Sequence, residues 1–263
     1  MTTAVEPVGQ LIREWRQRRH LSQLDLACDA EISTRHLSFI ETGRSSPSRD
    51  MVLRLAEQLE IPLRSRNTLL TAAGFAPMFP ERPLADPALQ PARTAIDHLL
   101  AAHEPFPALA VDRHWTLVAS NEASRRLMGA VDPSLLAPSA NVLRISLHPL
   151  GLASRIVNFG EWRAHVLSRL RRQVDVSADP ILRALADELA AYPTPPTASA
   201  EEASPYGDVI VPLRLATDAG VLSFLSTTTI FGTPVDVTLS EIALESFFPA
   251  DAATANALRA LAS

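Results

Sequence analysis

The N-terminal part of the chain is organised around residues 22–48, which read SQLDLACDAEISTRHLSFIETGRSSPS. Ser22 is a good N-cap, and Asp25 three residues later completes a pattern like a capping box, so a helix is expected to begin here. Ser33 is a second N-cap. The segment therefore predicts two short helices that are joined by a tight turn and followed by a loop around Gly43.

The second of these helices has one apolar and one polar face. Leu37 and Ile40 lie on the face that we expect to be buried. The outward face carries Thr34, Arg35, Ser38 and Phe39. A short helix with a polar, Arg-bearing outer face can enter the major groove of DNA. The alternative is an ordinary helical hairpin, but two caps, a turn and a loop at one fixed spacing favour DNA binding.

The segment resembles the helix-turn-helix of the XRE (Cro/CI-like) repressors at Ser22-Gln23, Leu26-Ala27, Ile32-Ser33, Leu37, Ile40-Glu41, Gly43 and Pro47-Ser48. The resemblance implies phosphate contacts by Gln23, by Arg44 and by the backbone near Ser48. The groove would be faced by Ser33, Thr34, Arg35 and Ser38. One motif covers one half-site, so we expect a homodimer on a double-stranded DNA operator.

The turn of the motif departs from the family pattern, because the usual Gly is replaced by Glu31. A residue other than Gly is strained at positive φ, and a carboxylate near DNA is repulsive. We therefore expect a reshaped turn or an altered helix angle.

The composition is that of a globular protein, with 263 residues, 47% hydrophobic and 20% charged. This length fits one large or two modest domains. No apolar run reaches the length of a membrane span, and the N-terminus lacks a signal-peptide core, so we expect a cytoplasmic protein without membrane contact. The single cysteine, Cys28, fits a reducing compartment. A packed core thiol is favoured over a redox sensor at this position.

Amphipathic periodicity extends the helical region on both sides of the motif. Residues 8–19 form one such helix, Ser48 caps another, and residues 63–73 form a fifth that stops at Gly74. We expect an all-α, lambda-repressor-like helix-turn-helix domain over residues 1–75. Its basic charge is weak overall, so affinity for DNA needs local clusters such as Arg13, Arg16, Arg18 and Arg19.

Five prolines between residues 76 and 91 predict a semi-rigid linker. The remaining residues, 92–263, show mixed periodicity. Helices are predicted at about 91–103, from Asn121, and at 141–147, 160–173, 179–191 and 251–261, with strands at 108–111, 115–119, 209–215, 221–230 and 242–248 and a loop at 192–204. This is an α+β domain with an antiparallel sheet, in the order of a PAS-like sensor.

The second domain also resembles a known family, the MmyB-like ligand-binding domain. The matching segments are 105–123, Asn141-Val-Leu-Arg144 with His148-Pro149, Ile156-Val-Asn158 before Glu161-Trp162, Phe231-Gly-Thr-Pro234 and Phe247-Phe-Pro-Ala-Asp251. The resemblance implies an XRE-type bacterial transcriptional regulator with a PAS-like pocket for a small, largely apolar molecule such as a fatty acid. The apolar contacts expected there include Trp115, Trp162, Phe224 and Phe231, with Val111, Leu117, Leu143, Ile156 and Ile230 as further lining candidates.

Three polar residues, Arg144, His148 and Asn158, are the candidates to fix one end of that ligand. For Arg144 the alternative is an ion pair with an acid, and for His148 it is the end of a helix. Isolated polar residues more often serve structure, so both interpretations stay open.

The sequence shows no catalytic constellation. His98 and His103 are five residues apart, which is the wrong spacing for one face of a helix, and there is no Gly-rich phosphate loop or Gly-x-Ser-x-Gly elbow. We expect neither an enzyme nor a cofactor, apart from a bound fatty acid or other apolar molecule. Two alternatives stay open: an enzyme that carries a helix-turn-helix, and a ligand-independent regulator whose second domain only dimerises or docks a protein.

Overall fold

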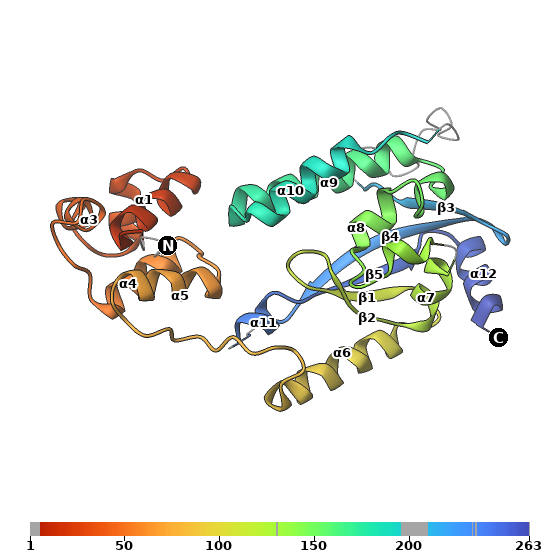
Figure 1. Ribbon diagram of the computed structural model, residues 1–263, viewed down its shortest axis with the longest axis horizontal. Coiled ribbons are helices and arrows are strands. Elements are labelled where there is room, and N and C mark those ends of the chain that lie inside the picture. Colours follow the sequence, from red (N-terminus) through yellow and green to blue (C-terminus); the bar gives the residue numbers. More distant parts are fainter. Residues whose placement is uncertain (1–5, 130, 196–209, 233, 235, 263) are drawn as a thin grey trace. The chain divides into compact units, whose positions relative to one another are not determined.

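The computed structural model describes residues 6–129, 131–195, 210–232, 234 and 236–262. The chain forms two compact units (Figure 1). The first, the helical unit, comprises Met1–Pro83 with Thr233–Ser240. The second, the α+β unit, comprises Leu84–Gly232 with Glu241–Ser263. Within the described residues, no helix combines the length and the apolar character needed to cross a membrane.

The helical unit contains the five predicted helices: α1 (Val8–Arg18), α2 (Gln23–Asp29), α3 (Thr34–Glu41), α4 (Arg49–Gln58) and α5 (Leu63–Ala72). Their apolar faces form one tight core, in which Ile12, Leu26, Leu37, Val52 and Leu55 are fully buried. The predicted helix-turn-helix fold is confirmed, and its stability comes from burial of these faces.

Side-chain caps set the starts of three of these helices. The Ser22 hydroxyl accepts from the Asp25 N–H at 3.1 Å and the Asp25 carboxylate accepts from the Ser22 N–H at 2.9 Å, which is a complete capping box. Ser33 caps α3 and Ser48 caps α4, each by accepting a single bond from a backbone N–H. The turn residue Glu31 has φ 53°, so it adopts the conformation usual for Gly, at a cost of about 1–2 kcal/mol.

A distant segment of the chain completes the helical unit. Helix α11 (Val237–Ser240) lies in the connection between two strands of the sheet, yet it packs with α5. The Val237 N–H donates to the Pro80 carbonyl at 2.8 Å, and Arg82 pairs with the buried Asp236 at 3.1 Å. The Asn67 side chain also bonds the backbone at Phe79. Part of the predicted linker is therefore held against α5.

The α+β unit is built on an antiparallel sheet with strand order β2-β1-β5-β4-β3. The strands are β1 (Ala108–Val111), β2 (Leu117–Ser120), β3 (Leu213–Thr217), β4 (Gly220–Ile230) and β5 (Ala243–Pro249). The helices are α6 (Gln90–Ala102), α7 (Glu122–Met128), α8 (Val142–Leu147), α9 (Phe159–Ser177), α10 (Pro180–Ala191) and α12 (Ala252–Ala262). Helices α7–α10 are inserted between β2 and β3, so the predicted PAS-like α+β fold is confirmed.

Some boundaries differ from the prediction. The helix expected at 160–173 continues to Ser177 and ends at Ala178, which has φ 52°. The strand expected from residue 209 begins at Leu213, and residue 209 itself lies outside the described residues, as do residues 196–204 of the predicted loop.

The two faces of the sheet have different partners (Figure 1). Ile96 and Leu100 of α6 pack on one face, against Ala110 of β1 and Leu244 of β5. Successive strand residues point to opposite faces. Glu245, next to Leu244, therefore points to the other face, where the main core lies against α7–α10.

Candidate functional site

The outer face of α3 carries the residues predicted to meet DNA. Thr34 and Arg35 are exposed and Ser38 is half-buried. The Arg35 guanidinium lies 5.3 Å from the centre of the Phe39 ring, and that of Arg44 lies 5.9 Å from it. Phe39 therefore packs between two cations, which orders both of them on this face.

The predicted contacts Ser33 and Ser48 are exposed N-caps, at the starts of α3 and α4. Their hydroxyls already bond helix N–H groups, so a phosphate contact there falls to the remaining backbone N–H groups. These residues, with Arg35, Ser38 and Arg44, stay predicted DNA contacts.

A buried polar cluster holds α3, the predicted recognition helix, in place. Arg16 of α1 donates from Nε to Oε1 of Glu41 at 2.7 Å and from Nη2 to Oε2 at 3.0 Å. Gln23 of α2 donates to the same Oε2 at 2.7 Å. The hydrogen bond with Glu41 raises the pKa of Arg16, although burial acts to lower it. The three residues therefore join α1, α2 and the end of α3.

The structure of the helical unit corrects three expectations from the sequence. Arg16 is only 8% exposed, so it does not belong to a free basic surface with Arg13 and Arg18. Arg19 is likewise used internally, because it donates to the Leu59 and Glu60 carbonyls. Cys28 is exposed and is not the packed core thiol that we expected.

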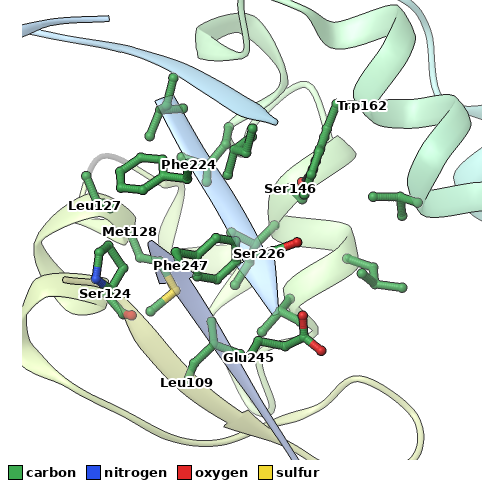
Figure 2. Close-up of a pocket in the computed structure, with 18 of the residues that line it drawn as sticks. Leu109, Ser124, Leu127, Met128, Ser146, Trp162, Phe224, Ser226, Glu245 and Phe247 are labelled. Atoms are coloured by element: carbon green, nitrogen blue, oxygen red, sulfur yellow. Dashed lines mark hydrogen bonds between the residues drawn. The ribbon is translucent and has the colours of Figure 1, made fainter. Parts of the chain in front are cut away.

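The α+β unit contains a cavity of about 110 Å³ on the sheet face opposite α6 (Figure 2). Strands β1, β3, β4 and β5 supply one wall, and α7, α8 and α9 supply the other. The apolar lining residues are Pro107, Leu109, Trp115, Leu127, Met128, Val142, Leu143, Ile145, Leu152, Trp162, Val166, Leu213, Leu215, Phe224 and Phe247. The polar ones are Ser124, Ser146, His165, Arg169, Ser226 and Glu245.

Three residues predicted to contact the ligand, Trp115, Trp162 and Phe224, line this cavity. Trp162 donates from Nε1 to the Ser146 hydroxyl at 2.9 Å. Trp115 donates from Nε1 to Gln173 at 2.8 Å. Both indoles are therefore oriented by hydrogen bonds, with their apolar surfaces left for the cavity.

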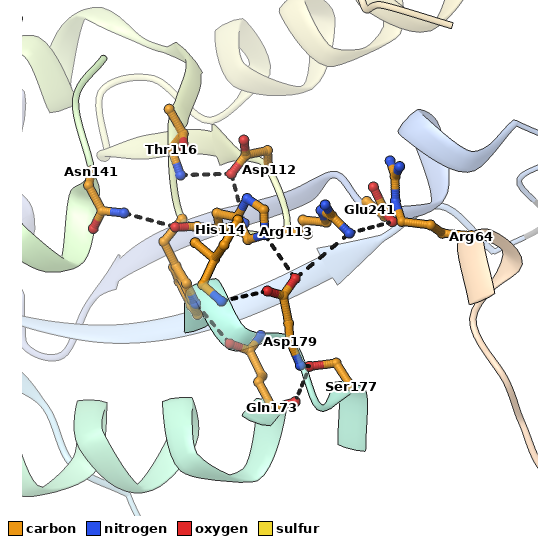
Figure 3. A network of polar contacts seen from close by, with 12 residues as sticks. Arg64, Asp112, Arg113, His114, Thr116, Asn141, Gln173, Ser177, Asp179 and Glu241 are labelled. Atoms are coloured by element: carbon orange, nitrogen blue, oxygen red, sulfur yellow. Dashed lines mark hydrogen bonds and ion pairs between the residues drawn. The ribbon is translucent and has the colours of Figure 1, made fainter. Parts of the chain in front are cut away.

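Trp115 stands in the β1–β2 turn with φ 66°, a conformation that is strained for a bulky residue. A polar network holds this turn (Figure 3). The Asp112 carboxylate accepts from the His114 and Thr116 N–H groups, both at 2.8 Å. The His114 ring bonds Asp179, at the start of α10, at 2.9 Å. The turn is thus joined to the junction of α9 and α10, which fixes Trp115 in the cavity wall.

The same contacts change the acidity of Asp179. Burial acts to raise its pKa, but hydrogen bonds from the His114 ring and from the Ile181 N–H, together with the charge of Arg113, outweigh burial and lower it. Asp179 is therefore held as a carboxylate, which strengthens its hydrogen bond with the His114 ring.

An ion pair forms one part of the cavity wall. Arg169 of α9 donates from Nη1 to Oε2 of Glu245 at 3.0 Å and from Nη2 to Oε1 at 2.6 Å. The Thr228 hydroxyl donates to Oε1 at 2.8 Å. The guanidinium lies 4.5 Å from the centre of the Trp115 ring.

Neither residue of this pair was predicted from the sequence to line the pocket. One signal could have found it, since Glu245 is an acid at an inward position of an alternating apolar strand. His165, one turn earlier on α9, stacks on Trp162 with the ring centres 5.5 Å apart.

Arg144 and His148 lie outside the cavity lining. Arg144 forms a two-pronged ion pair with Glu188, at 2.8 and 2.7 Å. That pairing lowers the pKa of Glu188. The His148 ring packs on Tyr192, whose pKa is raised to about 12 by burial and by the bond to Glu188. The structure therefore places Arg144 in an ion pair with an acid and His148 at the end of α8, which are the alternatives to ligand binding given above.

Asn158 and Phe231 also lie away from the cavity lining. Asn158 donates to the Pro212 carbonyl at 2.8 Å and accepts from the Arg214 N–H at 3.1 Å, so it joins α9 to β3. Phe231 packs on the α6 side of the sheet. Ile230, a further lining candidate, is 67% exposed. In the described part of the chain, no cluster of His, Cys, Asp or Glu side chains is arranged to hold a metal ion.

Comparisons with known proteins agree with this architecture. Residues 12–65 match a helix-turn-helix family. An uncharacterized HTH-type transcriptional regulator of Bacillus subtilis (strain 168), RghRB, is 37% identical over 78 residues, which are 29% of this chain and 54% of that protein. The chain thus spans about half the length of this curated relative.

A solved structure of an RNA-binding light-oxygen-voltage receptor aligns with 97% of this chain and 63% of its own, at 16% identity. Its TM-score of 0.24 is too low to support an argument. Residues 92–261, more than half of the chain, match the family described as the MmyB-like transcription regulator ligand binding domain. The protein therefore belongs to the family of MmyB-like transcription regulators with a ligand-binding domain.

Proposed function

We propose that this protein is a cytoplasmic transcriptional regulator that binds a DNA operator as a homodimer and responds to a small, largely apolar, fatty-acid-like ligand. The observation that carries the proposal is the mainly apolar cavity of the α+β unit. It lies within the region that matches the ligand-binding family. A mainly apolar cavity with a few convergent polar groups is the usual form of a small-molecule site.

The size of the cavity indicates how a ligand could change the conformation of the α+β unit. Its volume of about 110 Å³ is smaller than the roughly 150 Å³ of an engineered cavity that binds benzene. An elongated ligand therefore requires lining side chains to move aside. A ligand that fits one arrangement better than another shifts the protein toward that arrangement.

The strands of the cavity wall give such a shift a path to the DNA-binding helices. β4 contributes Phe224 and Ser226 to the wall, and β5 contributes Phe247. The connection between these two strands carries Asp236 and α11, which belong to the helical unit. We propose that a movement of β4 or β5 reaches, along this connection of the chain, the residues that pack with α5.

The test has two steps. Selection from a random DNA library yields an operator for the full chain, and fluorescence anisotropy then measures affinity with and without decanol or decanoate. We expect at least one compound to change the affinity by about fivefold or more, the lower range of allosteric coupling. Failure to select any sequence, or an affinity that saturating compounds leave unchanged, would contradict the proposal.

Two variants separate ligand uptake from its transmission. Val166→Phe fills the cavity, so it should abolish the ligand response while DNA affinity without ligand is kept. Asp236→Asn keeps an acceptor for the Thr238 N–H but weakens the pair with Arg82. It should bind ligand normally and show a reduced effect of ligand on DNA affinity.

A further inference from the structure

The polar atoms of the cavity follow an order along its walls. On β4 the inward residues are Phe224, then Ser226, then Thr228, and Thr228 stands opposite Glu245 of β5. On α9 the cavity face runs from Trp162 through His165 to Arg169. Both walls therefore change from aromatic to polar toward the same end of the cavity. At that end Arg169 meets Glu245 and Thr228.

The charges at this polar end already balance. Both outer nitrogens of Arg169 are bonded to the two carboxylate oxygens of Glu245, whose side chain is 5% exposed. The Trp115 ring covers the guanidinium. Arg169 thus has a full countercharge before any ligand enters, and a buried two-pronged pair of this kind resists separation.

His165 adds no charge to this end. Burial lowers its pKa, and the charges of Arg169 and Arg172 lower it further, against the opposing charges of Glu161 and Glu245. The neutral ring has one donor and one acceptor nitrogen.

Three uncharged groups keep hydrogen-bonding capacity toward the cavity. Ser146 accepts from Trp162 and keeps its own hydroxyl proton to donate. In the part of the chain that the structure describes, the Ser226 hydroxyl and the His165 ring have no hydrogen-bond partner, although both line the cavity. Polar groups in such walls are normally satisfied by protein, water or a ligand.

We infer that the polar end of the ligand is an uncharged hydrogen-bonding group, such as an alcohol or an amide, and not a carboxylate. This inference rests on the proposed function and narrows it, because the ligand then has the elongated apolar chain of a fatty acid but not its charged end. A carboxylate that entered would lie beside Glu245 without a free cation, and like charges in a poorly solvated site repel strongly. An alcohol or amide can instead bond Ser226, Ser146 and His165 with no change of charge.

Isothermal titration of the full chain at neutral pH with decanol, decanamide and decanoate tests the inference, because the three differ only in the polar end. We expect decanol or decanamide to bind about tenfold or more tightly than decanoate, since an unpaired buried charge costs more than the 1.4 kcal/mol that corresponds to tenfold. Tighter binding of decanoate would overturn the inference and leave the proposed function standing. No binding of any of the three would contradict both.

Glu245→Gln is the decisive variant, because it leaves Arg169 without its countercharge at nearly the same shape. Decanoate should then bind about tenfold more tightly than to the natural protein, so the preference for decanol or decanamide should fall by about the same factor. Glu188→Gln is the matched control, since it releases Arg144 from a similar pair outside the cavity and should leave the preference unchanged. If Glu245→Gln does not fold, Ser226→Ala replaces it, and it should weaken decanol severalfold while decanoate is unaffected. An unchanged preference in Glu245→Gln, or equal effects of Ser226→Ala on both compounds, would refute the inference.

Discussion

Each unit of the molecule contains a buried pair of arginine and glutamate, and the two pairs have different surroundings. Arg16 and Glu41 of the helical unit have side chains 10% and 2% exposed, and they are enclosed by a tight apolar core. Arg169 and Glu245 of the α+β unit are 26% and 5% exposed, and both line a cavity.

The difference shows how the same interaction serves structure in one unit and a binding site in the other. The helical unit has a third member, Gln23, that completes the cluster and fixes α2 against the recognition helix. In the α+β unit the pair forms part of the cavity wall. The neighbouring polar groups Ser146, Ser226 and His165 keep hydrogen-bonding capacity toward the cavity. Packing around the pair, rather than the pair itself, decides which role it has.

Removing one carboxylate from each unit should give the largest contrast. Glu41→Ala leaves Arg16 buried without a countercharge, so we expect the free energy of unfolding of the helical unit to fall by about 3–5 kcal/mol. Glu245→Ala leaves an arginine that is partly exposed and beside a cavity, so a loss of about 1–3 kcal/mol is expected. Urea unfolding, followed by hydrogen exchange of peptides from each unit, measures both. Equal losses would remove the distinction between the two pairs.

A larger side chain at a buried valine should also affect the stability of the two units differently, and this is the next largest expected effect. Val52 is fully buried in the helical core, and Val52→Phe should destabilise that unit by about 1–3 kcal/mol, as overpacking does. Val166 lines the cavity, so the ring added by Val166→Phe has space, and a change below about 1 kcal/mol is expected. Urea unfolding of the two variants provides the comparison. A large loss for Val166→Phe would mean that the cavity closes in solution.

Base recognition is predicted for the outer face of α3 in the helical unit. Arg35→Ala should cost about 1–3 kcal/mol at one base position per half-site, because Arg commonly reads guanine through two hydrogen bonds. Gln23→Ala is the control, and it should weaken all sequences alike. Binding-site selection with each variant measures the preference. A preference that Arg35→Ala leaves untouched would show that another residue reads the base.

The smallest expected effect is a pH dependence of the α+β unit. The pKa of His165 is lowered in the folded chain, so the unfolded state binds its proton first as the pH falls. The contribution is complete above the ordinary pKa of 6.5 and is lost as the pH falls through the folded value. We expect less than about 1 kcal/mol, because water screens a half-buried ring. Thermal unfolding of His165→Gln between pH 7 and 5 should show a flatter dependence than the natural protein; parallel curves would exclude this contribution.

The sequence was most informative where structure depends on nearby residues. The caps at Ser22, Ser33 and Asn121 each start a helix as predicted, because a cap acts over two or three residues. Trp115 and Trp162 were found as cavity residues because the family resemblance placed a pocket among them.

The sequence was least informative where distant segments meet. Arg169 and Glu245 are 76 residues apart, and no periodicity predicts that one pairs with the other. Asp236 reaches Arg82 across 154 residues, so the contribution of α11 to the helical unit could not be read from the linker. Arg16 looked like one of several surface arginines, because only the fold brings Glu41 to it.

Extraction of the purified full chain tests most directly whether the α+β unit holds a small apolar molecule. The protein is denatured, extracted with organic solvent and measured by mass spectrometry, both as purified and after incubation with decanol and removal of the excess. We expect a stoichiometric apolar compound from the natural protein in at least one of these preparations, and its loss in Val166→Phe. Extracts that contain no such compound in either preparation, or equal amounts from the natural protein and from Val166→Phe, would contradict it.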